Sequence, residues 1–356
     1  MASQAQQSGA SRSRGASTMP AAIANWLLLV ALLVFAMVVI GGITRLTESG
    51  LSMVRWEPIS GTIPPLNEAQ WEAEFEAYRA SPEYQQVNRG MSLGEFKTIF
   101  FWEYVHRLLG RFIGLAFALP LAWFAWKRAI PRGYGWRLTA LLALGALQGA
   151  IGWWMVASGL VDRPEVSHIR LAVHLLAALF IFAGLIWTAL DLKLLARDPA
   201  ARPARLSVLS IWTLCLLGLQ LLFGAYVAGL EAGYAFNTWP KMGEEWYPAD
   251  TPLLRPFIVN FADNPIVVQF VHRWLAWVVA GFAVALAATA WERGRRAEAV
   301  AVAASVTLQI VLGVATLLSG VEIGVAVAHQ AMAAVLLAAI VVAAHRLEAR
   351  TRGSSR

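Results

Sequence analysis

The chain has 356 residues, of which 58% are hydrophobic and 16 are tryptophan, and its mean hydropathy is +0.57. This composition excludes a soluble globular protein with polar outer faces and indicates an integral membrane protein. The net charge of +7 could suggest a nucleic-acid partner, but the positions of the charges along the chain indicate membrane topology instead.

The first residues are rich in Ser, Ala and Arg and contain no acidic residue. The segment has some features of a transit peptide. We favour a cytoplasmic tail over residues 1–21 that precedes a retained first helix.

Eight apolar segments follow, each long enough to cross about 30 Å of hydrocarbon as a helix. They cover residues 22–41, 99–126, 137–158, 168–190, 206–230, 265–290, 298–319 and 323–344. Continuous apolar runs lack the alternation of barrel strands, so the sequence predicts an all-α integral membrane protein with eight transmembrane helices.

Arginine and lysine cluster in every second connection between these segments. They are Lys127, Arg128, Arg132 and Arg137, then Lys193, Arg197, Arg202 and Arg205, then Arg293, Arg295 and Arg296. The intervening loops are acidic, above all the long outer loop at 42–98. By the positive-inside rule, both termini are predicted to face the cytoplasm.

Four segments of the first half recur in the same order in the second half. ESGLSMVRW at 48–56 matches EAGYAFNTW at 231–239, and VHRLLG at 105–110 matches VHRWLA at 271–276. LQGAIGWWMVASGL at 147–160 matches LQIVLGVATLLSGV at 308–321, and His174 matches His329. The repeat predicts two pseudo-symmetric four-helix bundles related by an axis along the membrane normal.

The predicted organisation follows from this repeat. The N-terminal bundle covers residues 22–190, and a cytoplasmic linker covers 191–205. The C-terminal bundle covers 206–345, and a second cytoplasmic tail covers 346–356.

Four histidines lie at one predicted depth, on the helices that enter from the outer face: His106, His174, His272 and His329. Each is about two turns inside its segment, which places it roughly 10 Å below the outer hydrocarbon boundary. A single such histidine is often a helix–helix hydrogen bond. Two per repeat favour bis-histidine ligation of a heme iron, whereas zinc would need three or four converging ligands. The two other histidines, His168 and His345, lie at helix ends and are interpreted as interface residues.

Glu103 distinguishes the two copies, because WEYVHR in the first corresponds to VQFVHR in the second, with Gln269 in its place. Glu103 shares a helix face with His106, so its carboxyl is directed toward whatever the histidine holds. The alternative is a buried ion pair with Arg107 at the i, i+4 spacing. We favour a catalytic Glu103, since the ion pair alone does not explain why Arg273 has no such partner.

Several arginines are candidates for contacts with heme propionates. Arg107 and Arg273 follow the histidines and could bind propionates or extend to the outer interface. Arg45 and Arg55, just after the first span, are weaker candidates. The single cysteine, Cys215, excludes an intramolecular disulfide or a Cys-ligated cluster, so any redox chemistry needs another carrier.

With these motifs in view, the chain resembles the heme A synthase family over about residues 22–345. The resemblance rests on GGITRLTESGLSMVRWEPISGTIPPL at 41–66, EYVHRLLGR at 103–111, NTWPKM at 237–242 and QFVHRW at 269–274. A long first outer loop without cysteines is similar to the alphaproteobacterial and mitochondrial branch. One departure is Phe100, where the fuller family pattern has a further glutamate.

The resemblance implies an oxidoreductase that converts the C8 methyl group of heme O to the formyl group of heme A through successive hydroxylations, for cytochrome c oxidase. It implies that His106 and His174 are axial to the substrate heme, that Glu103 is catalytic, and that His272 and His329 hold a heme b cofactor. The expected location is the bacterial inner membrane, with the heme sites toward the periplasm. Heme O synthase and membrane lipid are expected partners, a homo-oligomer is compatible with the sequence, and no nucleic acid is expected.

Two other functions are compatible with the residues alone. A diheme bis-histidine cytochrome b that only transfers electrons would use the same four histidines but gives Glu103 no role. A transporter built from two repeats would need no heme.

Overall fold

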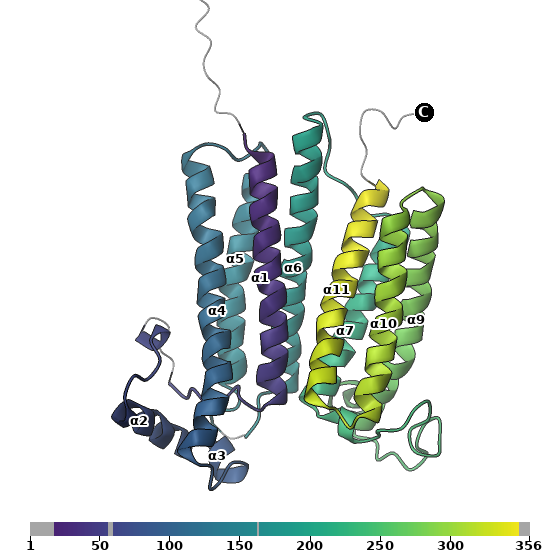
Figure 1. Ribbon diagram of the computed structural model, residues 1–356. Helices are drawn as coiled ribbons and strands as arrows, with labels where there is room; N and C mark the ends of the chain where they lie inside the picture. The colour runs from purple at the N-terminus through teal and green to yellow at the C-terminus, as the bar shows by residue number, and fades with distance from the viewer. Residues whose placement is uncertain (1–17, 56–59, 162–163, 349–356) are drawn as a thin grey trace, which may run out of the picture.

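The structure is a computed structural model that describes residues 18–55, 60–161 and 164–348, and over these residues it is built from helices (Figure 1). The predicted tails at 1–21 and 346–356 lie largely outside this part of the chain. Within it, the prediction of an all-α protein with eight membrane-spanning helices is confirmed.

The eight long helices follow the predicted segments closely. They are α1 (Pro20–Leu46), α4 (Leu93–Trp126), α5 (Gly135–Val156), α6 (His168–Arg197), α7 (Val208–Gly229), α9 (Pro265–Glu292), α10 (Arg296–Leu318) and α11 (Ile323–Glu348). The largest differences are at α4 and α6. A capping box of Ser92 and Glu95 starts α4 six residues before the predicted start at 99. Helix α6 continues to Arg197 and so includes part of the predicted linker.

The helices stand in two groups of four (Figure 1). In the first group, α1, α4, α5 and α6 contact one another around a ring, and α7, α9, α10 and α11 do the same in the second. The two described ends of the chain lie at the same end of the helices, opposite α2 and α3 (Figure 1). Which side of the membrane this end faces stays a prediction from the basic loops.

The two groups meet along α1, α6, α7 and α11. At their inner ends a buried carboxylate connects them, because Asp191 of α6 lies 2.9 Å from Nε2 of His345 of α11. Arg137 of α5 and the backbone N–H of Ala204 complete its partners, at 2.6 and 2.9 Å. His345 is therefore a buried partner of Asp191, which the interpretation as an interface residue missed.

The long outer loop forms a small cap on the protruding start of α4. It contains η1 (Ser60–Thr62), α2 (Glu68–Arg79) and α3 (Pro82–Gln86). Phe75 and Tyr78 of α2 stack on Phe96 of α4, and the cluster includes Phe100. The second outer loop is built around η2 (Ala232–Tyr234), η3 (Phe257–Val259) and α8 (Asn260–Asp263).

Candidate functional site

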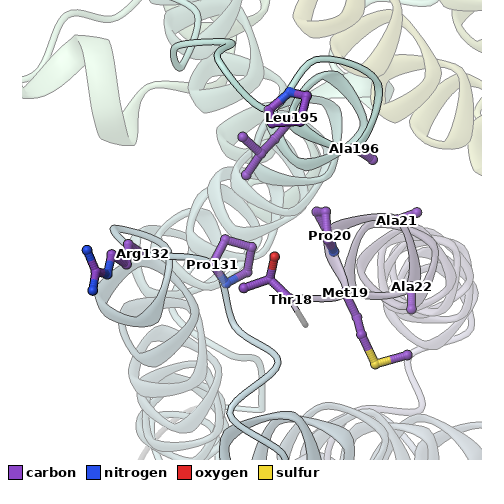
Figure 2. Close-up of a pocket in the computed structure, with 10 residues that line it drawn as sticks. Thr18, Met19, Pro20, Ala21, Ala22, Pro131, Arg132, Leu195 and Ala196 are labelled. Carbon is purple, nitrogen blue, oxygen red and sulfur yellow. The ribbon is translucent and has the colours of Figure 1, made fainter. Parts of the chain in front are cut away.

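A hollow of about 760 Å³ opens at the N-terminal end of α1, lined among others by Met19, Pro131 and Leu195 (Figure 2). The predicted site residues lie near the opposite end of α1. We therefore build the candidate site from the histidines and not from this hollow.

Each of the four intramembrane histidines packs its ring on a glycine of the neighbouring helix. A β-carbon added to these glycines would lie only 2.8 to 3.1 Å from Cε1 of the facing ring. The pairs are Gly41 of α1 with His106 of α4, Gly152 of α5 with His174 of α6, Gly224 of α7 with His272 of α9, and Gly313 of α10 with His329 of α11. Every glycine lies four or five residues before the end of its helix. The rings therefore share one depth near the outer ends of the helices.

The histidines are arranged in two pairs, one in each group of helices. His106 and His174 are close enough for their rings to interact electrostatically, and so are His272 and His329. The structure thus brings together the residues that the sequence analysis assigned to each heme.

The donor set fits a heme iron held from both sides. Among the described residues, no three His, Cys, Asp or Glu side chains converge as a bare metal ion would require. Two imidazoles in each bundle are the ligand set of a six-coordinate heme. Within the same part of the chain, Nδ1 of His106 and Nδ1 of His329 are buried without a hydrogen-bond partner.

Glutamine side chains contact three of the four histidines, which the sequence analysis did not predict. Nε2 of Gln148 lies 3.1 Å from Nδ1 of His174, and Nε2 of Gln220 lies 3.1 Å from Nδ1 of His272. Nε2 of Gln309 lies 3.4 Å from Nε2 of His329. Each glutamine is one turn before the glycine that faces the same histidine, and this Gln-x-x-x-Gly spacing is the signal that could have identified them.

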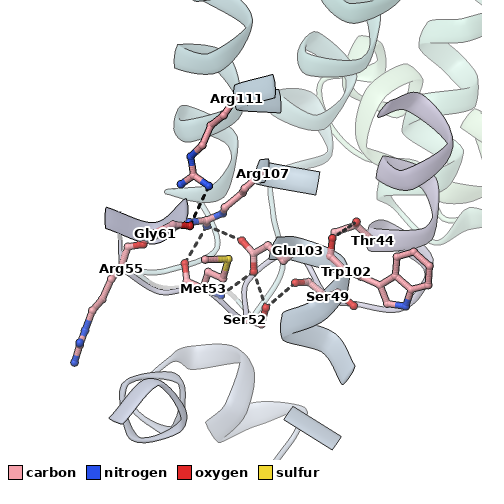
Figure 3. A network of polar contacts seen from close by, with 10 residues as sticks. All are labelled: Thr44, Ser49, Ser52, Met53, Arg55, Gly61, Trp102, Glu103, Arg107 and Arg111. Carbon is pink, nitrogen blue, oxygen red and sulfur yellow. Dashed lines mark hydrogen bonds and ion pairs between the residues drawn. The ribbon is translucent and has the colours of Figure 1, made fainter. Parts of the chain in front are cut away.

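Glu103 lies in a network between α4 and the outer loop (Figure 3). Its Oε1 pairs with Arg107 at 2.5 Å, and its Oε2 accepts hydrogen bonds of 2.7 Å from the Ser52 hydroxyl and the Met53 backbone N–H. The side chain is 4% exposed. The ion pair considered from the sequence is present, and the same carboxylate also fastens the outer loop to the helix that carries His106.

Arg107 and Arg273 make the same contacts in the two halves. Arg107 donates to the carbonyls of Met53 and Arg55, and Arg273 donates to those of Phe236 and Thr238, which are the equivalent positions of the repeat. Arg273 therefore needs no carboxylate partner, which the sequence comparison left unexplained. Gln269 donates to the Phe236 carbonyl at 3.0 Å, whereas Glu103 accepts from the N–H of the equivalent Met53.

The other two candidate arginines, Arg45 and Arg55, contact protein groups. Arg45, at the end of α1, donates to the Ala228 carbonyl at 3.1 Å and pairs with Glu231 at 3.2 Å, which connects the two groups of helices. Arg55 is half exposed and lies 3.7 Å from Glu74 of α2. As propionate contacts, both stay predictions.

Glu83 of α3 is a buried carboxyl that the sequence analysis missed. Its loop is rich in charged residues, and such a loop is normally exposed to solvent. It is 5% exposed, and its Oε2 has no partner in the described part of the chain. Burial raises its pKa to about 8, a hydrogen bond from Tyr78 opposes this rise, and the neighbouring carboxylates of Glu103 and Glu48 add to it. Phe100, which stands where the fuller family pattern has a glutamate, is 3% exposed in the same cap.

Comparison with known proteins gives the same family over nearly the whole chain. The COX15-CtaA family profile, described as a cytochrome oxidase assembly protein, matches residues 24–341. A protein named heme A synthase from Rhizorhabdus wittichii is 60% identical over 334 residues, covering 93% of this chain and 96% of the relative. Proteins of the same name from Sphingopyxis alaskensis and Novosphingobium aromaticivorans are 54% and 49% identical, covering 93% and 92% of this chain and 94% and 96% of their own lengths.

The buried Glu83 predicts a pH-dependent cap. Its pKa is about 8 in the folded chain against an ordinary 4.5, so the native state binds more protons between these values. The free energy of unfolding therefore falls as the pH rises from about 4.5 to about 8. Glu83→Gln should raise the thermal midpoint in detergent more at pH 9 than at pH 5, whereas Glu72→Gln, exposed on α2, should not. A Glu83→Gln effect of equal size at both pH values would contradict the assignment.

The contact between glycine and imidazole predicts a second effect. Gly224→Ala should push the His272 ring out of place and reduce the heme bound per chain, measured by Soret absorbance of the purified protein. Gly218→Ala on the same helix is the matched control, since a β-carbon there meets no described atom within 4 Å. Alanine is the better helix former by about 1 kcal/mol, so helix propensity cannot cause the loss. Full heme content in Gly224→Ala would show that the close contact is dispensable.

Proposed function

This chain belongs to the COX15-CtaA family of cytochrome oxidase assembly proteins and functions as a heme A synthase, and we propose how its residues divide that task. The substrate is heme O, whose C8 methyl group is oxidised to the formyl group of heme A. The first group of helices holds the substrate through His106 and His174. The second group holds a heme b cofactor through His272 and His329.

This assignment of substrate and cofactor to the two groups of helices rests on the different surroundings of the two histidine pairs. Glu103 lies one turn before His106 on α4, whereas the equivalent residue beside His272 is Gln269. A resident electron carrier needs no carboxyl next to its ligand. Oxidation of a methyl group releases protons and develops charge beside the porphyrin, which a fixed carboxylate can accept or stabilise.

The chain's own groups then have distinct tasks. His106 and His174 fix the substrate in the bundle, and the glycines facing them give the rings space. Glu103, one turn before His106 on α4 and paired with Arg107, handles protons near the reacting methyl group. Arg107 holds Glu103 and the carbonyls of Met53 and Arg55, so the outer loop closes over the site.

The second group supports electron removal. Heme b, when bound, supplies one-electron transfer, and His272 and His329 would hold its iron. Arg273 fastens the second outer loop over this pair through loop carbonyls. Arg45 joins the loop ends of the two groups, which keeps the two sites in a fixed relation.

The location and partners follow from the same assignment. The basic connections support a location in the bacterial inner membrane with both heme sites toward the periplasm. So apolar a substrate is best passed within the membrane, which makes a heme O synthase the expected donor. A plain diheme cytochrome b is not favoured, because the curated relatives are heme A synthases.

Extraction and chromatography of the bound hemes tests the division of labour. We expect heme b together with heme O or heme A in the purified wild type. His272→Ala and His329→Ala should deplete heme b, whereas His106→Ala should block conversion and leave heme b largely in place. Equal loss of heme b in all three variants would refute the assignment of the two groups, and two equivalents of heme b alone would favour the cytochrome.

The role of Glu103 has its own test. Glu103→Gln introduces the residue that the second copy carries naturally at 269, so the fold should be kept. We expect heme A formation to fall by about 10²-fold or more, the usual contribution of a positioned acid or base, with both hemes still bound. Glu95→Gln, exposed at the start of the same helix, serves as the control. Undiminished heme A formation in Glu103→Gln would remove Glu103 from the mechanism.

A further inference from the structure

Buried carboxyls lie at the outer end of only one of the two groups of helices. Among the described acidic and amide side chains at these ends, the first group buries Glu83 of the cap and Glu103 of α4, which are 5% and 3% exposed. The second group buries Asn260, Asn264 and Gln269 instead. The outer end of the first group therefore holds buried side chains that can carry a proton, and that of the second holds amides.

The asparagines of the second group have structural partners. Asn260 accepts from the backbone N–H of Leu254 at 2.9 Å and donates to the carbonyl of the same residue at 3.0 Å. Asn264 donates to the carbonyl of Pro252 at 2.9 Å and caps the start of α9. These amides fasten the second outer loop, and they neither gain nor lose protons near neutral pH.

Glu83 is not satisfied in the same way. The buried Tyr78 donates a hydrogen bond to its carboxyl and also accepts one of 2.7 Å from Asn88. Oε2 of Glu83 is buried and has no partner within the described residues. A purely structural contact with Tyr78 would be met as well by a glutamine, without the cost of burying an acid. A buried carboxyl with a free oxygen is suited instead to accepting a proton and passing it on.

The surroundings of Glu83 connect Glu103 with the surface. Glu83 is close enough to both Glu103 and Glu48 for the carboxyls to interact electrostatically. Glu48 is exposed, in the turn that follows α1. Shortly after it in the chain, Ser52 and Met53 donate the hydrogen bonds that hold Glu103 (Figure 3). Three carboxyls thus lead from a buried position on α4 to an exposed turn.

We propose that Glu83 is a proton relay between Glu103 and the outer solvent, and that the proton leaves the protein at Glu48. The inference rests on the proposed function, in which Glu103 takes up protons released as the methyl group is oxidised. In the relay, the O–H bond on Glu103 breaks as one forms at Oε2 of Glu83, and Glu83 then gives a proton to Glu48 or to water. No electron moves in this step, and each carboxyl regains its charge once the proton has left. Glu83 does not touch the substrate and acts only through Glu103.

Heme A formation by Glu83→Gln tests the relay. Membranes from cells that also make heme O are opened with mild detergent at a set pH, and the hemes are extracted and separated by chromatography. We expect formation at pH 8 to fall about tenfold, against about 10²-fold for loss of a directly acting acid or base, with both hemes still bound. Glu72→Gln, exposed on α2, is the matched control. The thermal midpoint of Glu83→Gln should not fall, so a weakened cap cannot cause the loss.

The pH profile separates a relay from a packing role. Burial raises the pKa of Glu83 to about 8, the hydrogen bond from Tyr78 and the charge of Arg45 oppose this rise, and the carboxylates of Glu103 and Glu48 add to it. Only the ionised carboxyl can accept a proton, so heme A formation by wild type should increase from about pH 6 to about pH 8. Glu83→Gln should lack this increase, and Glu83→Asp, which keeps a carboxyl, should regain it.

The outcomes distinguish this inference from the proposed function. Heme A formation in Glu83→Gln that equals wild type, or that is lowered by the same factor at pH 6 and pH 8, would overturn the relay alone, provided that Glu103→Gln is impaired. Undiminished formation in Glu103→Gln would remove Glu103 from the mechanism, and the relay with it.

Discussion

An imidazole ring fits between two closely packed membrane helices only where the facing helix has no side chain, and this steric requirement is met four times in this chain. Each glycine that faces a histidine lies near the outer end of its helix, so four rings share one depth. The ring-like contacts within each group of four helices then bring the rings together in pairs. Small residues at helix contacts are common in membranes, but here the space they leave is filled by a ring that can bind a metal.

A second repeated contact fastens the two outer loops to the helices that carry His106 and His272. Arg107 and Arg273 lie partly or fully buried, and each donates to backbone carbonyls at equivalent loop positions. Carbonyls spare a buried guanidinium most of the cost of lost hydration without fixing an opposite charge nearby. In the first half a carboxylate is added to this arrangement. Glu103 sits between Arg107 and the loop, on the helix that carries His106, and its side chain is 4% exposed.

Much of this fold was predictable from the sequence, because hydropathy, charge placement and an internal repeat act along the chain. The eight helices, the differing residues Glu103 and Gln269, and the pairing of the histidines by bundle all follow from such patterns. Contacts between distant segments were not predictable in the same way. Asp191 with His345 joins two helices 154 residues apart, and the burial of Glu83 depends on how the outer loop folds over α4. Gln148 and Gln309 were visible as matched residues, but their role needed the structure to show which ring each one touches.

The departures from the repeat are concentrated on one side of one site. Beside His174, Gln148 and Gly152 occupy the sequence positions that Gln309 and Gly313 occupy beside His329. In the first copy, Met37 stands four residues before Gly41, where the other three helices carry a glutamine, and Glu103 stands where the second copy has Gln269. In the proposed function, the carboxyl at 103 is the difference that separates the reacting site from the site that holds the cofactor. Both departures therefore lie on the helix pair α1 and α4, which carries His106, whereas the pair α5 and α6 keeps the repeated residues beside His174.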